Sequence, residues 1–83
     1  MKTAIVYSGP RCSWCDRVKV LLIENDYEIE EKSITDGGVM EEFQNKFTQT
    51  LRTVPQVVID DKLIGGFAET EVLIKGPLSI NKI

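Results

Sequence analysis

The chain has no histidine and only two cysteines among its 83 residues. A structural zinc site takes four ligands, usually cysteine and histidine, so a single copy of this chain cannot supply one. Two cysteines are also too few for the disulfide framework that holds small secreted domains together. The scarcity of both residue types therefore excludes two common ways of stabilising a small fold.

A strong charge bias and long apolar runs are absent as well. The formal net charge is −3, which gives no electrostatic reason to expect nucleic acid or an anionic membrane as a partner. No apolar run approaches the ~20 residues of a membrane span, and the first ten residues lack the apolar core and cleavage site of a secretory signal. We expect one soluble, cytoplasmic domain over residues 1–83, with 76–83 as a short C-terminal tail.

Hydrophobic periodicity divides the chain into alternating strands and helices. Strands are predicted over 2–7, 27–33, 55–60 and 62–66, and helices over 13–25, 38–49 and 67–75. The first two strands, joined by a helix, should be parallel, and the last two should form a hairpin about Asp60 and Asp61. The order β-α-β-α-β-β-α predicts an α/β fold with a four-stranded mixed sheet and helices on both faces.

The apolar positions of these segments predict the core. In the strands they are β-branched and aromatic residues, and in the helices they recur at intervals of three and four residues. The residues expected to be buried are Tyr7, Val18, Leu21, Leu22, Phe43, Phe47, Val57, Val58 and Ile59.

Both cysteines lie where the first strand gives way to the first helix. Cys12 is expected in the first helical turn, where unpaired backbone N–H groups, the helix dipole and the neighbouring Arg11 would lower the pKa of its thiol. Cys15 follows one turn later and should be more buried. This arrangement suits thiol–disulfide exchange, in which Cys12 attacks a disulfide and Cys15 resolves the mixed disulfide. The alternative is a pair of buried structural cysteines, but the position inside a β-α-β pattern favours the redox function.

Two segments resemble the signatures of the glutaredoxin family. The stretch YSGPRCSWC at 7–15 resembles the family's active-site segment, whose usual motif is Cys-Pro-Tyr-Cys. The stretch RTVPQVVIDDKLIGGFAE at 52–69 resembles its second signature, Thr-Val-Pro followed by a hairpin and Gly-Gly. The resemblance extends from about residue 2 to residue 75. It implies a single glutaredoxin-like domain with a thioredoxin-like fold and a cis peptide bond before Pro55.

The resemblance also implies a function and its partners. It implies an enzyme, a glutathione-dependent thiol–disulfide oxidoreductase that reduces protein disulfides or glutathione mixed disulfides through Cys12 and Cys15. Glutathione would be a co-substrate, with no tightly bound cofactor and no metal site, and the protein would act as a monomer. Its partners would be disulfide-containing proteins, with ribonucleotide reductase as a target by family analogy.

Residues matching the family's glutathione-binding positions can be assigned one by one. They are Arg11, Trp14, Arg52, Thr53, Val54, Pro55, Gly66, Phe67 and Ala68. Arg11 and Arg52 would supply positive charge, Trp14 a flat apolar surface at the rim, and Thr53, Val54 and Pro55 the docking groove.

Three departures from the family pattern keep two alternatives open. Gly9 stands where many members have lysine, and Ala68 and Glu69 stand where the family often has Asp-Asp. These two changes favour a glutaredoxin-like electron donor reduced by thioredoxin reductase. Ser13 and Trp14 replace the usual Pro-Tyr, with Ser13 expected to help cap the helix. Family members that lack this proline sometimes carry an iron–sulfur cluster ligated with glutathione, which is the second alternative.

Overall fold

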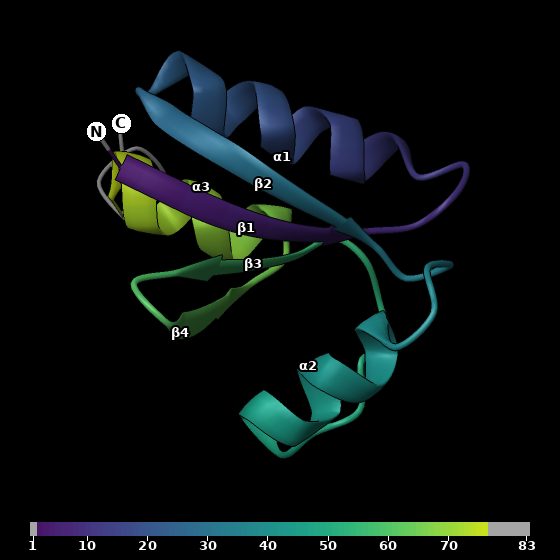
Figure 1. The fold of residues 1–83 in the computed structure, drawn as a ribbon. Coiled ribbons are helices and arrows are strands. Elements are labelled where there is room, and N and C mark those ends of the chain that lie inside the picture. The colour runs from purple at the N-terminus through teal and green to yellow at the C-terminus, as the bar shows by residue number, and fades with distance from the viewer. Residues whose placement is uncertain (1, 77–83) are drawn as a thin grey trace.

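The computed structural model describes residues 2–76 and contains four strands and three helices (Figure 1). In chain order they are β1 (Lys2–Ser8), α1 (Ser13–Glu24), β2 (Tyr27–Ser33), α2 (Val39–Phe47), β3 (Gln56–Ile59), β4 (Lys62–Gly65) and α3 (Phe67–Lys75). The order β-α-β-α-β-β-α confirms the prediction from periodicity, and it is that of the thioredoxin-like fold.

The strands form one mixed sheet in the order β2-β1-β3-β4. β1 and β2 are parallel, as the helical connection between them requires, with Lys2 opposite Tyr27. β3 runs antiparallel to β1, with Tyr7 opposite Gln56, and returns through a hairpin to β4. Asp60 and Asp61 both adopt positive φ, at 53° and 63°, which is the backbone of a type I′ hairpin turn. The predicted turn is therefore confirmed.

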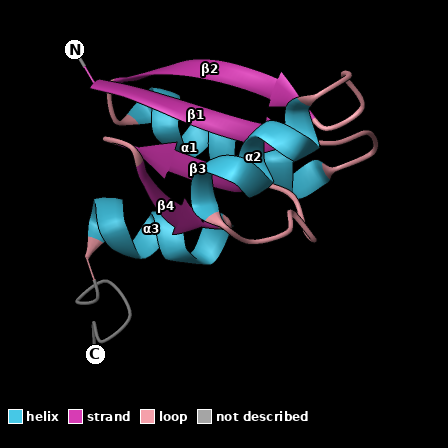
Figure 2. Ribbon diagram, turned by 60° about the horizontal axis from the view of Figure 1, so that its bottom comes forward, coloured by secondary structure: helices cyan, strands magenta, loops and turns pink. Residues whose placement is uncertain are grey.

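The sheet separates two apolar cores. Figure 2 shows α2 in front of the sheet, while α1 and α3 lie behind it. The core beneath α1 and α3 contains Ala4, Val6, Val18, Leu22, Val57 and Ile59. The core beneath α2 contains Tyr7, Phe43, Leu51 and Val58. The predicted layering of helices on both faces is thus confirmed.

One predicted core residue is only partly buried. Phe47 is half-buried at the last position of α2, where it packs against Phe43 with ring centroids 5.0 Å apart. The helix ends there because Thr48 turns into the left-handed region at φ 51°. The helix predicted over 38–49 is therefore shorter at both ends, and Phe47 lies at the margin of its core.

The last described element is α3, which Gly76 terminates with a positive φ of 82°. The tail expected at 76–83 lies outside the described residues from Pro77 onward. Among residues 2–76, no helix combines the length and the apolar composition that crossing a bilayer requires.

The topology brings both signature segments to one end of the sheet. β1 ends at Ser8 and β3 begins at Gln56, and the two strands are antiparallel with Tyr7 opposite Gln56. The loop that leads into α1 and the loop that leads into β3 must therefore lie next to each other. This end of the sheet carries the cysteines.

Candidate active site

Cys12 and Cys15 form a disulfide at the start of α1. Cys12 lies just before the helix in an extended conformation. The backbone N–H of Cys15 donates a hydrogen bond to the Sγ of Cys12 at 3.0 Å. The sulfur itself therefore serves as the N-cap of α1. The prediction that Ser13 helps cap the helix is wrong, because Ser13 is the first helical residue and Cys12 already occupies the cap.

The two sulfur-bearing residues differ in accessibility. Cys15 is 2% exposed, whereas Cys12 is half-buried. The exposed Arg11 before them has a φ of 54°, which turns the chain from the end of β1 into the helix. An incoming thiolate can therefore reach Cys12 more readily than Cys15. This asymmetry is the one that the sequence predicts for an attacking and a resolving cysteine.

The second signature segment lies against Cys12. The carbonyl oxygen of Val54 is 3.7 Å from the Sγ of Cys12, and the peptide bond between Val54 and Pro55 is cis. Pro55 is buried, while Thr53 is exposed and Val54 half-buried. Two segments about forty residues apart in sequence thus meet at the reactive sulfur.

Next to this contact runs a groove of about 300 Å³, which we call the uncharged groove. Its lining residues share the absence of any ionisable side chain, and they are Trp14, Thr53, Val54, Pro55, Gly66, Phe67 and Ala68. Trp14 is 50% exposed and lies against Phe67, with ring centroids 5.2 Å apart. The guanidinium of Arg17 lies 4.6 Å from the centre of the Trp14 ring. The groove therefore has one aromatic wall, which this cation contacts.

The start of α3 closes one end of the uncharged groove. Glu69 turns back so that its Oε1 accepts a hydrogen bond from the N–H of Gly66 at 2.9 Å. Gly65 has a φ of 126°, and a Cβ built there would lie 3.0 Å from the Cβ and Cγ of Glu69. Glycine at 65 is thus required by both the backbone and the neighbouring side chain. The Glu69 carboxylate is used in capping its own helix.

The disulfide also borders a second hollow of about 420 Å³, which we call the charged cavity. Its lining contains both cysteines and four ionisable side chains, and comprises Ser8, Gly9, Arg11, Cys12, Ser13, Cys15, Asp16, Lys19 and Glu31.

A hydrogen-bonded ion pair forms part of the charged cavity. Lys19 Nζ donates to Glu31 Oε2 at 2.9 Å, and the buried Ser8 hydroxyl donates to the same oxygen at 2.7 Å. The Ser8 hydrogen bond and then the Lys19 hydrogen bond lower the pKa of Glu31, and the bond with Glu31 raises the pKa of Lys19. Both groups are thereby held in their charged forms.

The sequence prediction did not include Ser8, Lys19 or Glu31. One signal was present, because Lys19 follows Cys15 by four residues and so shares its helix face. Glu31 could be found only from the parallel register of β1 and β2, in which it pairs with Val6, two residues before Ser8.

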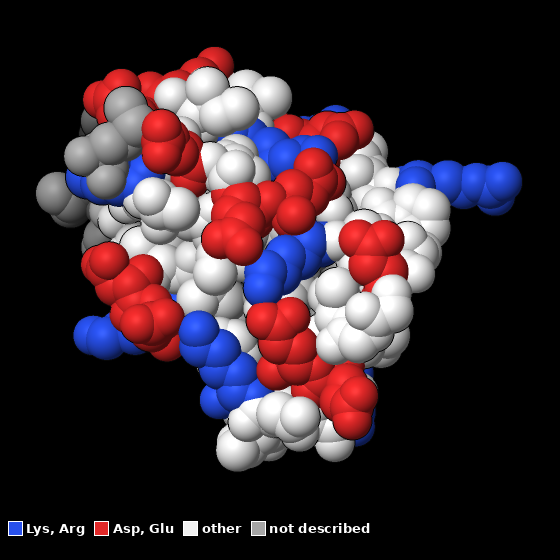
Figure 3. Space-filling view, in the orientation of Figure 1, with Lys and Arg blue, Asp and Glu red and all other residues white. Residues whose placement is uncertain are grey.

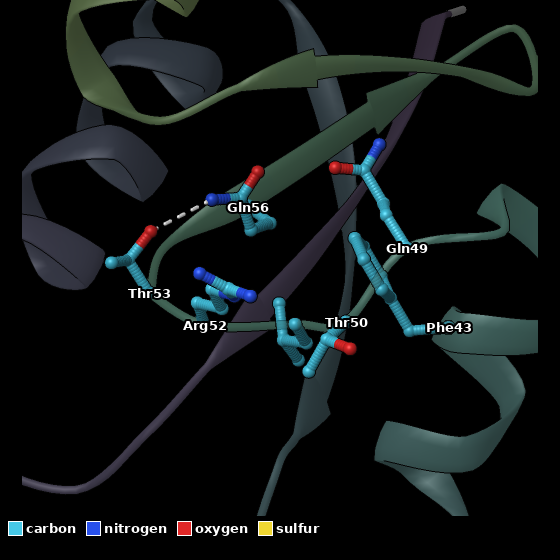
Figure 4. Close-up of a pocket in the computed structure, with 7 residues that line it drawn as sticks. Phe43, Gln49, Thr50, Arg52, Thr53 and Gln56 are labelled. Carbon is cyan, nitrogen blue, oxygen red and sulfur yellow. Dashed lines mark hydrogen bonds between the residues drawn. The ribbon is translucent and has the colours of Figure 1, made fainter.

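Arg52 lies in a third hollow of about 520 Å³ (Figure 4). This hollow is bounded by Phe43, Gln49, Thr50, Leu51, Arg52, Thr53 and Gln56. Within it, the Gln56 amide donates to the Thr53 hydroxyl at 3.1 Å. Thr53 borders both this hollow and the uncharged groove, so the two adjoin.

The predicted binding residues are thus divided among three hollows. Seven of the nine line the uncharged groove, whereas Arg11 lies in the charged cavity and Arg52 in the third hollow. The two predicted cations, Arg11 and Arg52, therefore lie outside the lining of the uncharged groove. Acidic and basic side chains are interspersed on the face of the molecule that Figure 3 shows.

Comparison with known proteins points to one family. Residues 4–64 match the family model described as Glutaredoxin. A glutaredoxin of Haemophilus influenzae is 28% identical over 82 residues, which cover 92% of this chain and 94% of the relative.

Solved structures agree with this match. Glutaredoxin 1 from Francisella tularensis, crystallised with cacodylate, superposes with a TM-score of 0.72 at 28% identity, covering 95% of this chain and 99% of the other. A buckwheat glutaredoxin–glutathione complex superposes with a TM-score of 0.69 at 26% identity, covering 95% of this chain and 74% of the other.

Proposed function

This chain belongs to the glutaredoxin family, whose typical activity is thiol–disulfide exchange, and we propose on that premise that it is a glutathione-dependent thiol–disulfide oxidoreductase. The observation that carries the proposal is the disulfide between a half-buried Cys12, which caps α1, and a buried Cys15 one turn later. The same position that exposes Cys12 to a substrate places the amide of Cys15 3.0 Å from its sulfur. A thiolate at Cys12 would receive that hydrogen bond and the positive end of the helix dipole.

The reductive half of the cycle starts from the dithiol. The Cys12 thiolate attacks one sulfur of a substrate disulfide, a Cys12–substrate bond forms, and the second substrate sulfur leaves as a thiolate. Cys15, deprotonated, then attacks the Sγ of Cys12 and releases the remaining substrate sulfur. The substrate gains two electrons and the protein is left with the Cys12–Cys15 disulfide.

Glutathione completes the cycle in two steps. One glutathione thiolate attacks Cys12, and Cys15 leaves and takes up a proton. A second glutathione attacks the glutathionyl sulfur on Cys12, which yields oxidised glutathione and the Cys12 thiolate. A related buckwheat protein has been crystallised with glutathione, which supports this choice of reductant. In our proposal Thr53, Val54 and Pro55 orient the attacking molecule, and Arg11 and Arg52 attract its carboxylates from outside the groove.

The test is turnover of a small mixed disulfide with glutathione, measured for wild type, Cys12→Ser and Cys15→Ser. We expect Cys12→Ser to fall to background, a loss on the order of 10³-fold or more, because no nucleophile remains. Cys15→Ser should keep turning over glutathione mixed disulfides, since free glutathione attacks the glutathionyl sulfur on Cys12 and releases the Cys12 thiolate without using Cys15. Thermal melting of each variant checks that it is folded. Activity that survives in folded Cys12→Ser would refute the assignment.

A second electron donor has a specific observation in its favour. The uncharged groove contains no ionisable side chain, and the Glu69 carboxylate nearby is bonded to the Gly66 amide. If the folded wild-type protein does not reduce the mixed disulfide with glutathione but does so with thioredoxin reductase and NADPH, the electron donor is the reductase. The exchange chemistry of Cys12 and Cys15 would then be the same.

A further inference from the structure

The resolving cysteine lies where its own reaction is disfavoured. Cys15 must be a thiolate when it attacks the Sγ of Cys12, and it leaves as a thiolate when glutathione attacks Cys12. Cys15 is 2% exposed, so water has little access to a charge on its sulfur. A charge in such a position is unfavourable unless a group of opposite sign compensates for the lost hydration. The reaction therefore calls for a cation near Cys15.

The charged cavity is where Cys15 meets ionisable side chains. They come from the loop before α1, from α1 and from β2, and they are Arg11, Asp16, Lys19 and Glu31. β1 contributes the uncharged hydroxyl of Ser8. The cations and the carboxylates balance in number, so their combined effect on a thiolate depends on how far each group is screened by solvent.

Lys19 is the most enclosed of the four ionisable groups. Its side chain is 24% exposed, against 46% for Glu31 and 79% for Asp16, and Arg11 is exposed as well. Solvent and salt screen an exposed charge much more than an enclosed one. Lys19 also follows Cys15 by four residues, so the two side chains share a face of α1. Its ammonium is therefore the charge of this cavity best placed to act on Cys15.

Two carboxylates hold the ammonium in this position. The Nζ of Lys19 lies 2.9 Å from Glu31 Oε2 and 3.7 Å from Asp16 Oδ1. The hydrogen bond with Glu31 raises the pKa of Lys19, so the group keeps its charge at neutral pH. An ammonium has three N–H donors, and each of these carboxylates meets it through one oxygen atom. A third donor is thus available to a thiolate in the same cavity.

We propose that Lys19 is a positioning residue of the resolving step, whose ammonium stabilises the thiolate of the buried Cys15. The inference rests on the proposed thiol–disulfide exchange and assigns a residue to its second step. In that step the Cys15 proton passes to bulk water and the bond between Cys15 and Cys12 forms. The bond from Cys12 to the substrate breaks, and the substrate sulfur leaves with the electron pair as a thiolate. Cys15 is oxidised and the substrate sulfur is reduced.

The experiment times the two exchange steps separately. Reduced protein is mixed with the symmetrical disulfide of thionitrobenzoate, which releases one coloured thiolate when Cys12 attacks it and a second when Cys15 attacks Cys12. The second phase is unimolecular, so the pH profile of its rate constant follows the ionisation of Cys15. We expect Lys19→Met to move the midpoint of that profile up by about one pH unit, which slows the second phase ~10-fold at neutral pH.

Two more variants distinguish electrostatic stabilisation from a structural role. Lys19→Arg keeps a cation and should return the midpoint to near the wild-type value. Glu31→Gln removes the carboxylate that offsets part of the Lys19 charge, so it should move the midpoint in the opposite direction, to lower pH. If the ion pair mattered only for structure, Lys19→Met and Glu31→Gln would change the second phase in the same direction. Thermal melting of each variant checks that it is folded.

Lys32 supplies a matched control. It donates to Glu42 at 2.8 Å, its side chain is 23% exposed, and the bond with Glu42 raises its pKa as Glu31 does for Lys19. Lys32 directly follows Glu31 in β2, so its side chain points to the other face of the sheet, toward α2. Lys32→Met therefore breaks an ion pair of the same kind away from the cysteines, and it should leave both phases as they are.

The outcomes separate this inference from the proposed function. An unchanged second-phase midpoint in Lys19→Met would overturn the inference and leave the exchange activity intact. Equal shifts of both phases would also overturn it, because the cation would then act on Cys12 and Cys15 alike. If folded, reduced protein releases no coloured thiolate at all, the exchange activity itself is refuted.

Discussion

The uncharged groove and the charged cavity both lie near Cys12, yet they share no lining residue. The groove meets Cys12 through Val54 and has an aromatic wall. The cavity is lined by both cysteines together with two cations and two carboxylates. Cys15, which the cavity reaches, is buried, and Cys12 is half-buried. The difference teaches that both cysteines border charged groups, whereas only Cys12 also has an uncharged surface next to it, at Val54.

Helix α1 contributes residues to both the uncharged groove and the charged cavity. The first turns of α1 contain Trp14, Cys15 and Arg17, and successive side chains of a helix point ~100° apart. Trp14 and Arg17, three residues apart, meet at the groove. Cys15 and Lys19, four residues apart, meet at the cavity. Neighbouring positions of α1, such as Trp14 and Cys15, therefore line different hollows.

The largest effect is expected when a charge is put into the groove. Val54→Asp would place a carboxylate beside Cys12 and repel its thiolate, so fewer molecules would carry the reactive form at neutral pH. We expect alkylation of the reduced protein by iodoacetamide to slow by ~10-fold, with its midpoint moved to higher pH by about one unit. Val54→Asn, of the same shape but uncharged, is the control. If Asp and Asn variants react alike, the absence of charge in the groove has no bearing on Cys12.

A smaller effect is expected when a charge is taken out of the cavity. Glu31→Gln keeps an acceptor for Ser8 but removes the ionic part of the Lys19 contact. Because Glu31 is partly exposed, with 46% of its side chain accessible, the loss of unfolding free energy at pH 7 should be below ~1 kcal/mol.

The difference in unfolding free energy between wild type and Glu31→Gln should depend on pH, and this dependence gives the sharper test. Ser8 and Lys19 lower the pKa of Glu31, so the stabilisation is present above its ordinary value of 4.5 and is lost as the pH falls through the folded value. Urea unfolding of wild type and Glu31→Gln should differ at pH 7 and converge at acid pH. Glu28→Gln, a change at an exposed carboxylate of the same strand, should show no such convergence. A constant gap down to pH 3 would exclude Glu31 ionisation as its source.

The smallest effect concerns the cation outside the groove. Arg17→Met removes the contact with the Trp14 ring, which at an exposed site contributes ~0.5 kcal/mol. The measurement is a double-mutant cycle by urea unfolding, in which Arg17→Met is made in wild type and in Trp14→Ala. The destabilisation should disappear in the Trp14→Ala background. The same loss in both backgrounds would mean that Arg17 acts through another contact.

The sequence predicted what is local and missed what depends on tertiary packing. The strands and helices follow from periodicity over a few residues, and the redox pair follows from its place between β1 and α1. Phe47 was misplaced because an apolar residue at helical spacing does not reveal where its helix ends. Arg52 adjoins the groove residues in sequence, but it lies in the third hollow together with Leu51 and Thr53, a placement that no local spacing in the sequence indicates.

The charged cavity was the feature least accessible from sequence. Glu31 belongs to an acidic run that is typical of a solvated strand face. Its contact with Ser8 requires the parallel pairing of β1 and β2, and its contact with Lys19 requires α1 to pack over β2. None of these relations is encoded at a fixed spacing, so only the assembled sheet and helix reveal them.

The position of β2 has a consequence for self-association. In the described part of the chain, β2 is an outer strand of the sheet, so one row of its backbone groups is open to a strand from another molecule. Its sequence, YEIEEKS, includes Glu28, Glu30 and Glu31. Two copies joined along this edge would bring their carboxylates together and repel each other. The acidic run that sequence alone assigns to a solvated face thus also protects the protein from edge-to-edge aggregation.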